Sequence, residues 1–363
     1  MDLKQTLREL CLIPALSGHE QKLAAYLKTR FEACGLRVRE DALGNCIALA
    51  PGAGAAQPTV MVFGHMDQLG FVVRYIEEDG FLRLERVGGI PERALPALEV
   101  EVQCRDGRMI PGVIGNKAHH ATPPEEKYVV EKYTSLFVDI GAHSRAQVEG
   151  LGIRVGSPVV YAGRFRELLD GRVSATSLDN RVACAVLAAL AERLRDAPVA
   201  VPVALVGTVQ EEFNLRGAMV AGRTVRPALA VGLDIALEGG SPEMRGKNPV
   251  LMGRGPVLSL YNFHGRGTLN GTIPHPGMVR LFEQAAAQQG IPLQREATMG
   301  SLTDLSYLQL EGAGVKSVDI GVPCRYTHTP AEVCDLGDLQ QTVDLVYAAL
   351  ARIPQINLER EGA

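Results

Sequence analysis

The 363-residue chain contains no tryptophan, and aromatic residues make up only 5% of it. It also lacks a long apolar run, since the longest, Val182–Ala191, is far shorter than the roughly 20 residues that a membrane-spanning helix needs. A large excess of one charge is missing too, because 37 basic and 41 acidic residues leave a net charge of −4. We therefore expect no membrane partner and no nucleic-acid partner.

Cysteine usage excludes two further classes of protein. The seven cysteines are scattered, odd in number and form no C-x-x-C pair, which disfavours a disulfide framework and a thiolate zinc site. The first residues have no basic start and no apolar stretch of the kind that marks a secretory signal. We expect buried, reduced thiols and a cytoplasmic protein. The motif G-x-S-x-G is also absent, so a serine hydrolase elbow has no support.

Two regions of the chain show alternating strand and helix patterns. Short, continuous, β-rich runs are separated by helical periodicity, and they stand at Val60–Phe63, Val203–Val206, Leu229–Leu233 and Val318–Ile320. Such runs are typical of strands that are covered on both faces. The alternation predicts an α/β fold whose sheet is mostly parallel and flanked by helices.

The segment between these two regions has a different character. From about residue 71 to residue 168 the helical periodicity disappears, and short alternating strands separated by turn signals replace it, at 81–87, 98–104, 109–114, 136–140 and 158–161. We predict one catalytic α/β domain formed by residues 1–70 and 169–363, split by an inserted β-barrel-like domain at residues 71–168. Two α/β domains in series would leave the middle segment unexplained.

Five polar patches stand where apolar runs end, and a parallel sheet binds its ligands in the crevice beyond the carboxyl ends of its strands. A single buried His or Asp is more often a satisfied core group than a ligand. Five such patches at element ends reverse that expectation and indicate a ligand set for two divalent metal ions, with ligands from His65, Asp179, one glutamate of the Glu211–Glu212 pair, Asp234 and His328.

The chemistry of these residue types fits a catalytic site. Two metal ions about 3.5–4 Å apart need a shared carboxylate, and imidazole with carboxylate ligands suits zinc or cobalt. Asp67 follows His65 by two residues, so its side chain faces the same way and can orient the imidazole. Glu211 and Glu212 are adjacent, and their side chains diverge along an extended chain, which leaves one for the metal and one for the attacking water.

These segments resemble, in order and spacing, the M42 family of metallo-aminopeptidases, the tetrahedral aminopeptidases. The matching stretches are GHMDQLGF (64–71), SLDNR (177–181), TVQEEFNLRGA (208–218), GLD (232–234) and RYTHTPAEV (325–333), with further similarity at SGHE (17–20), PGVIGNK (111–117), DIGA (139–142) and GRGPVLSL (253–260). The resemblance implies a zinc-peptidase-like α/β domain with an inserted barrel-like domain. It also implies removal of N-terminal residues from peptides, and dimers that assemble into a hollow dodecamer.

The resemblance assigns a role to each ligand. His65 and Asp234 would bind the first metal, Glu212 and His328 would bind the second, and Asp179 would bridge both. We expect two divalent ions per subunit, zinc above all, with cobalt and manganese as alternatives. The same resemblance makes Glu211 the general base and places Asp67 behind His65.

Three residues depart from the family pattern. Gln68 stands where the family usually has Glu, Asn180 where a second Asp is common, and Asn214 where Gly is usual. None is an inferred ligand, so metal binding should survive. Gln68 and Asn180 each remove a negative charge near the cluster, which bears on metal preference.

Two other sets of residues are weaker candidates. Asp304 either lies near the site, as the resemblance implies, or caps a helix, and both interpretations stay open. His119 and His120 are expected in an ordinary loop.

Three other functions compete with the aminopeptidase interpretation. A deacylase or carboxypeptidase on the same metal scaffold would need a different anchor for the substrate end, and the sequence does not display one. A glycosidase needs two carboxyls facing each other across a sugar at about 5–9.5 Å, which a diverging glutamate pair tied to metal does not supply. A non-catalytic binding protein is disfavoured because the ligand set and Glu211 are intact.

Overall fold

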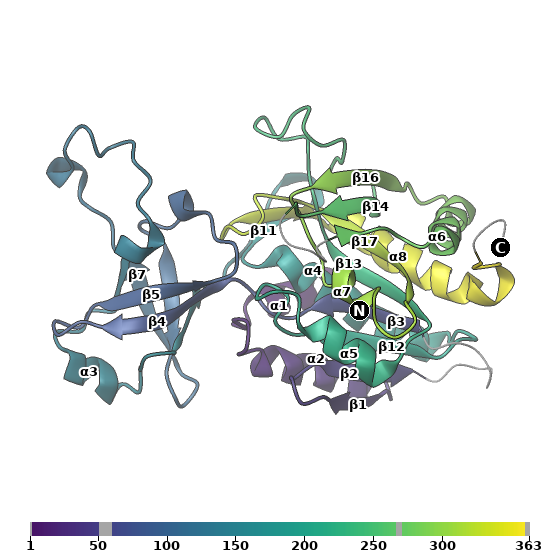
Figure 1. The fold of residues 1–363 in the computed structure, drawn as a ribbon, viewed down its shortest axis with the longest axis horizontal. Coiled ribbons are helices and arrows are strands. Elements are labelled where there is room, and N and C mark those ends of the chain that lie inside the picture. Colours follow the sequence, from purple (N-terminus) through teal and green to yellow (C-terminus); the bar gives the residue numbers. More distant parts are fainter. Residues whose placement is uncertain (1, 51–59, 266–270, 360–363) are drawn as a thin grey trace.

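A 12-stranded mixed sheet forms the larger part of the molecule (Figure 1). The structure is a computed structural model that describes residues 2–50, 60–265 and 271–359. The four central strands are parallel to one another, in the order β12 (Val203–Thr208), β3 (Val60–His65), β13 (Leu229–Leu237) and β17 (Lys316–Arg325). Their carboxyl ends therefore meet at one edge of the sheet.

Mostly antiparallel strands extend the sheet on both sides of this centre. One edge carries β2 (Cys46–Ala50) and β1 (Arg37–Glu40), and the other carries β18 (Glu332–Asp335), β11 (Arg172–Ala175) and β10 (Phe165–Glu167). A branch from β17 consists of β14 (Val257–Phe263), β15 (Gly271–Thr272) and β16 (Gln294–Met299), in which β14 and β16 are parallel. The α/β fold class with a mixed sheet is confirmed. Its parallel part is smaller than expected, because short connections such as β10–β11 and β17–β18 fold back as antiparallel pairs.

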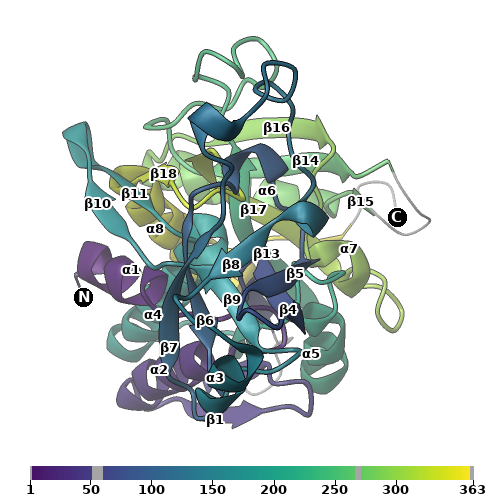
Figure 2. The ribbon, with the colours of Figure 1, turned by 90° about the vertical axis from the view of Figure 1, so that its left-hand side faces the viewer.

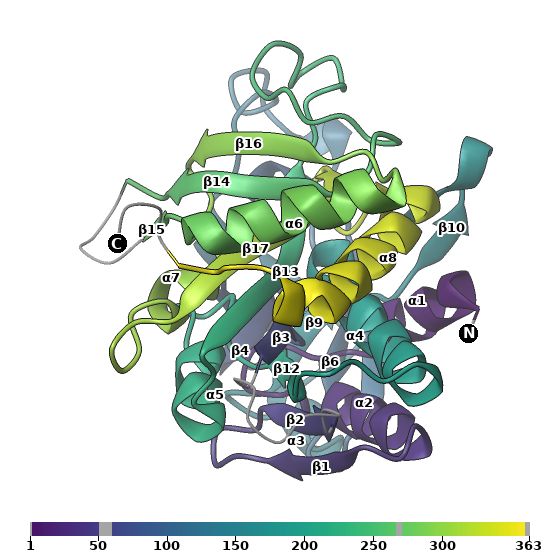
Figure 3. The same ribbon diagram turned by 90° about the vertical axis from the view of Figure 1, so that its right-hand side faces the viewer.

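Helices cover both faces of this sheet because alternate residues of each central strand point to opposite sides. Val60 and Val62 belong to the largest core cluster, whereas Met61 and Phe63 belong to a second one. The first face packs against α1 (Leu3–Cys11), α2 (Gln21–Ala33), α4 (Leu178–Asp196), α6 (Pro276–Gln289) and α8 (Leu336–Arg352). The second face packs against α5 (Gly217–Val225) and α7 (Leu305–Leu308). Figure 3 shows α6 and α8 lying across the first face.

A closed six-stranded barrel lies beside the sheet with a hydrophobic core of its own (Figures 1 and 2). Its strand order is β4-β5-β8-β7-β6-β9, and the strands are β4 (Gly70–Ile76), β5 (Leu82–Val87), β6 (Glu99–Gln103), β7 (Met109–Ile114), β8 (Phe137–Asp139) and β9 (Pro158–Tyr161). Helix α3 (Arg145–Gly150) links β8 to β9. The inserted barrel that the sequence indicates is thus present. The domain division at residues 70 and 169 stays a prediction.

The structure also bears on the membrane and cysteine expectations. Within the described ranges, no helix combines the length and the apolar character needed to cross a bilayer. All seven cysteines are buried and unpaired, in agreement with the expected thiols.

Candidate functional site

The predicted ligands converge at the carboxyl edge of the four central strands. His65 is the last residue of β3, and Asp234 lies in the second half of β13. Glu212 follows β12, and His328 follows β17. Asp179 lies at the start of α4, on the same side of the sheet. All five line one cavity of about 450 Å³.

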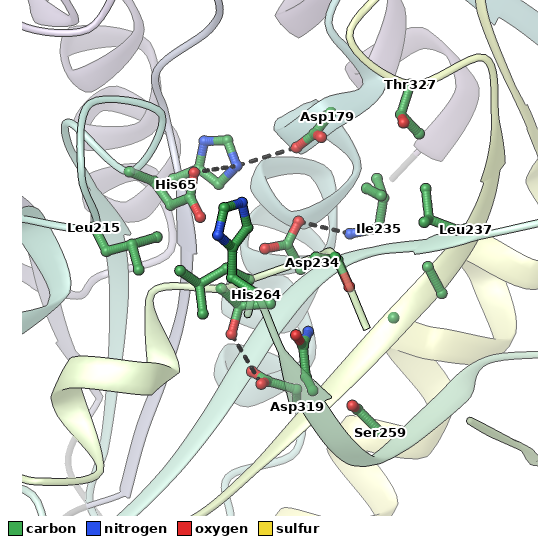
Figure 4. Close-up of a pocket in the computed structure, with 18 of the residues that line it drawn as sticks. His65, Asp179, Leu215, Asp234, Ile235, Leu237, Ser259, His264, Asp319 and Thr327 are labelled. Atoms are coloured by element: carbon green, nitrogen blue, oxygen red, sulfur yellow. Dashed lines mark hydrogen bonds and ion pairs between the residues drawn. The ribbon is translucent and has the colours of Figure 1, made fainter. Parts of the chain in front are cut away.

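Asp179 lies between the two histidines and presents a different oxygen to each. Its Oδ1 is 3.1 Å from Nε2 of His65, and its Oδ2 is 3.5 Å from Nε2 of His328. Figure 4 shows the first of these contacts at the cavity wall. A carboxylate in this position can serve two ions at once.

The ligand atoms form two clusters that share Asp179. In the first, atoms of His65, Asp179 and Asp234 lie within 4.8 Å of one another, and the second joins Asp179, Glu212 and His328 within the same limit. These are the two ligand sets that the sequence analysis assigned to the first and second metal. A third cluster of the same size consists of His65, Glu211 and Glu212.

The carboxylate of Asp67 binds the backbone N–H groups of Glu211 and Glu212. Its Oδ1 accepts a hydrogen bond from the Glu211 N–H, and its Oδ2 accepts one from the Glu212 N–H, both at 3.0 Å. The Ser17 hydroxyl donates to Oδ2 at 2.6 Å. Nδ1 of His65 lies 3.1 Å from the Asp67 carbonyl oxygen and 3.4 Å from its Oδ1. Asp67 can therefore orient the imidazole and, in addition, positions the Glu211–Glu212 backbone.

His328 is oriented by the barrel. Its Nδ1 lies 2.6 Å from the carbonyl oxygen of Gly89, in the segment that follows β5. A proton on Nδ1 donated to this carbonyl leaves the Nε2 lone pair facing Asp179 and Glu212. The Tyr161 hydroxyl, at the end of barrel strand β9, donates to the His328 carbonyl oxygen at 3.5 Å. The barrel thus reaches the site although it supplies none of the predicted ligands.

The electrostatics of the site are those of crowded, buried carboxyl groups. Burial raises the pKa of Glu212 to about 7, and burial together with the neighbouring Asp179 raises the pKa of Asp234 well above its ordinary value. Burial also raises the pKa of Glu211 far above its usual range. Burial alone would lower the pKa of His65, but the carboxylates of Glu211, Asp179 and Asp67 raise it well above its ordinary value. These shifts have one common source, an excess of carboxyl groups in a buried site, which disfavours further negative charge and favours cations.

These residues fit a pair of divalent cations. Glu212 Oε1 is buried without a hydrogen-bond partner in the described parts of the chain, as expected for an oxygen that binds a metal ion. Two ions would bring four positive charges to four carboxylates, those of Asp179, Glu211, Glu212 and Asp234. Imidazole and carboxylate donors without thiolate suit zinc and its neighbours in the first transition row.

The structure gives the local setting of all three departures from the family pattern. Gln68 Oε1 accepts from the Ala15 N–H and from Nη2 of Arg181, both at 3.0 Å. The Asn180 amide donates to the Leu233 carbonyl oxygen at 2.8 Å, where a carboxylate would have no proton to offer. Asn214 has a φ of 75°, in the left-handed region that Asn and Gly tolerate best. None of the three side chains is placed as a ligand.

The weaker candidates differ in position. Asp304 is buried, its Oδ2 accepts from the Thr208 hydroxyl at 2.7 Å, and it makes no side-chain cap bond to α7. The negative charge of Asp304 also raises the pKa of Glu211, so Asp304 contributes to the electrostatics of the site. His119 and His120 are exposed in the loop between β7 and β8 and do not line the cavity.

Sequence reasoning missed two groups that shape the site. Glu332 accepts the backbone N–H groups of Asp179 and His328, and its signal was a glutamate four residues after His328. Gly89 had no usable signal, because it acts through its carbonyl oxygen.

Comparison with known proteins gives consistent matches over nearly the whole chain. A family model described as M42 glutamyl aminopeptidase matches residues 44–345. The Escherichia coli protein SgcX is 36% identical over 95% of this chain and 92% of its own, and lysyl aminopeptidase of Pyrococcus furiosus is 30% identical over 87% of each. Among solved structures, an aminopeptidase from the archaeon Desulfurococcus kamchatkensis has a TM-score of 0.90 at 32% identity, covering 96% of this chain and 94% of that one. The Pyrococcus horikoshii TET1 peptidase, described as assembling into a tetrahedron or an octahedral shell, has a TM-score of 0.84 at 27% identity and covers 96% and 99%.

Proposed function

The chain belongs to the M42 family of aminopeptidases and is a peptide hydrolase. From that premise we propose that it removes N-terminal residues from peptides, with a dinuclear metal centre and a glutamate general base. The observation that carries the proposal is the position of Asp179. Its two oxygens face His65 at 3.1 Å and His328 at 3.5 Å. A carboxylate placed in this way can be common to two ligand sets.

Each ion would be held by three side chains of this chain. His65, Asp179 and Asp234 would hold one, and Asp179, Glu212 and His328 would hold the other. When bound, two such ions supply Lewis acidity to the scissile carbonyl and to the attacking water. We propose zinc as the resident metal, because the donor set combines imidazole with carboxylates and contains no thiolate.

Glu211 is the proposed general base. Its Oε2 is 3.9 Å from Nε2 of His65, so its carboxylate borders the first ligand set without belonging to it. It takes a proton from the attacking water and then delivers it to the nitrogen of the leaving amine. Asp67 supports this role because its carboxylate fixes the backbone N–H groups of both Glu211 and Glu212.

Metal content tests the proposal directly. Purified protein, stripped with a chelator and reloaded with zinc, should contain two ions per chain by elemental analysis. Asp179→Ala should lose both or nearly both, because only Asp179 belongs to both sets. Asp234→Ala and His328→Ala are the matched controls, since each removes a ligand of one set and should leave the other ion in place. Two ions retained by a folded Asp179→Ala would overturn the assignment. Reloading with cobalt and manganese ranks the metals by turnover.

We also propose that the protein is a homo-oligomer and that residues 71–168 act as an inserted domain that organises subunits. Support comes from exposed apolar side chains outside the catalytic cavity. Tyr128 and Val129 in the barrel loop are 95% and 64% exposed, and Leu169 beside β10 is 84% exposed. Such side chains are typical of contact surfaces between chains. A closed assembly, from a dimer to a dodecamer, would cover them.

A further inference from the structure

A row of polar side chains crosses three neighbouring strands in another part of the same cavity wall. Asp319 on β17 is the direct partner of Ser259 on β14, and Ser259 is the direct partner of Glu296 on β16. Directly opposed residues on paired strands share a face of the sheet, and all three line the cavity. Figure 4 shows Asp319 and Ser259 on the side of the cavity away from His65 and Asp179. We call these three residues the acidic row.

The acidic row contains acceptor atoms without donors. Asp319 Oδ1, Ser259 Oγ and Glu296 Oε2 are buried and have no hydrogen-bond partner in the described parts of the chain. The same holds for Oδ1 of Asn262, which also lines the cavity and is only 4% exposed. Leaving a buried polar atom unpaired costs about 1–3 kcal/mol. Four such atoms in one cavity wall indicate a ligand that brings several donors.

The ligand must also bring positive charge. The Thr303 hydroxyl donates to Asp319 Oδ2 at 2.9 Å, and Thr272 makes a further hydrogen bond to Asp319. Both partners are neutral. Within the described residues no lysine or arginine lines the cavity. Burial raises the pKa of Asp319 to about 7 and that of Glu296 to about 7. These carboxyl groups therefore have hydrogen-bond support but no counter-charge.

The acidic row lies within reach of a residue bound at the metal-ligand cluster. Asp319 is the partner of Gly232 on β13, and Asp234 follows Gly232 by two residues on the same face. A Cβ at Gly232 would collide with Asp319 Oδ1. The absence of a side chain at Gly232 therefore makes room for the Asp319 carboxylate. Two residues along one strand and one strand across place Asp234 and Asp319 roughly 8 Å apart at Cα. A lysine side chain spans roughly 6 Å from Cα to its ammonium.

We propose that the acidic row and Asn262 form the pocket for the side chain of the substrate's N-terminal residue, and that they select lysine or arginine there. The inference rests on the proposed aminopeptidase function. An ammonium carries three donors and a guanidinium five, which match the unpaired acceptors. An acidic side chain would meet two carboxylates, and an aliphatic one would leave the buried acceptors unpaired. The family does not decide the matter, since its model is named for a glutamyl enzyme and one relative is a lysyl enzyme.

Aminoacyl 4-nitroanilides of lysine, arginine, leucine, alanine and glutamate provide the first test, with the metal-loaded protein. We expect the highest kcat/KM for lysine or arginine. Asp319→Asn keeps the shape of the side chain and should lower kcat/KM for these two, relative to kcat/KM for leucine, roughly ten- to hundredfold. Glu296→Gln should act in the same direction. Glu311→Gln, which alters a surface ion pair with Arg223, is the control and should change no substrate ratio.

The outcomes separate this proposal from the proposed function. If leucine or glutamate substrates are cleaved without preference for basic residues, or Asp319→Asn slows all substrates equally, the specificity proposal is overturned and the aminopeptidase stands. If no aminoacyl substrate is cleaved, the proposed function fails, and calorimetric binding of lysinamide against leucinamide decides the pocket. Tighter binding of lysinamide that Asp319→Asn abolishes supports the pocket, and equal binding of the two amides rejects it. Circular dichroism of each variant verifies the fold.

Discussion

The side chain of Glu332 fixes the backbone of Asp179, because its Oε2 accepts the Asp179 N–H at 3.0 Å. Its other oxygen, Oε1, accepts the N–H of His328 at 2.6 Å. Glu332 is only 1% exposed. One buried carboxylate thus holds together the start of α4 and the loop after β17, and these two segments each carry a proposed metal ligand.

Glu332→Gln should weaken metal binding without unfolding the protein. An amide has one acceptor oxygen, so it can satisfy only one of the two N–H groups and turns its own donor toward the other. Loss of such a supporting contact typically costs roughly 10- to 100-fold in metal affinity. Competition with a chromogenic chelator measures the zinc affinity. Glu283→Gln, which alters a surface pair with Arg295, is the control, and wild-type affinity in Glu332→Gln would show that Glu332 does not position the ligands.

Glu211→Gln should keep both metals and lose turnover. The variant retains the shape of the side chain and the backbone contact to Asp67 but cannot accept a proton, and general-base catalysis contributes roughly 10²–10⁴-fold. Steady-state kinetics with a 4-nitroanilide, together with elemental analysis of the same sample, measures the effect. Near-normal kcat in a fully metal-loaded variant would place the base elsewhere. A fall in metal content would instead make Glu211 a ligand.

Much of the architecture could be predicted because buried strands leave continuous apolar runs. The run Val203–Val206 corresponds to β12, and Leu229–Leu233 to β13. Strand β4 (Gly70–Ile76) was not identified, since a bulge between Val73 and Tyr75 breaks its alternation and leaves two consecutive residues exposed. The antiparallel edges were also underestimated, because pairing direction depends on connections that periodicity does not encode.

The site was predictable where side chains carry the chemistry and unpredictable where register or backbone does. The predicted ligands converge because they lie at or near the carboxyl ends of strands that meet at one edge of the sheet. Gly89 could not be found, since it contacts His328 across 239 residues of sequence through a carbonyl oxygen. The acidic row depends on the register of β17, β14 and β16. Its one visible signal was Asp319, a charged residue inside the apolar run VKSVDIGVPC.

A free N-terminus should be required for cleavage. The proposed reaction places the N-terminal amine beside the metal-ligand cluster, inside a cavity of about 450 Å³, where acetylation would replace a small amine by a bulkier, neutral group. Peptides with a free N-terminus should lose residues one at a time from that end by mass spectrometry, and their acetylated forms should stay intact. C-terminally amidated peptides are the control and should be cleaved normally. Equal cleavage of acetylated peptides would favour a deacylase or endopeptidase, and loss on amidation would favour a carboxypeptidase.

The protein should form a closed oligomer through surfaces that include the barrel loop between β7 and β8. Tyr128 and Val129 in that loop are among the most exposed large apolar side chains of the described residues, and their burial between subunits would remove that apolar surface from water. Light scattering coupled to size exclusion should give a mass that is a multiple of the 363-residue chain. The double variant Tyr128→Glu, Val129→Glu should shift the mass to a smaller species, because it places charge in the contact.

Replacing the exposed Glu125 by Gln serves as the control in the same loop and should leave the mass unchanged. A monomer at micromolar concentration in the wild-type protein would reject oligomerisation, and a dimer unaffected by the double variant would move the interface away from this loop while leaving the catalytic proposal intact.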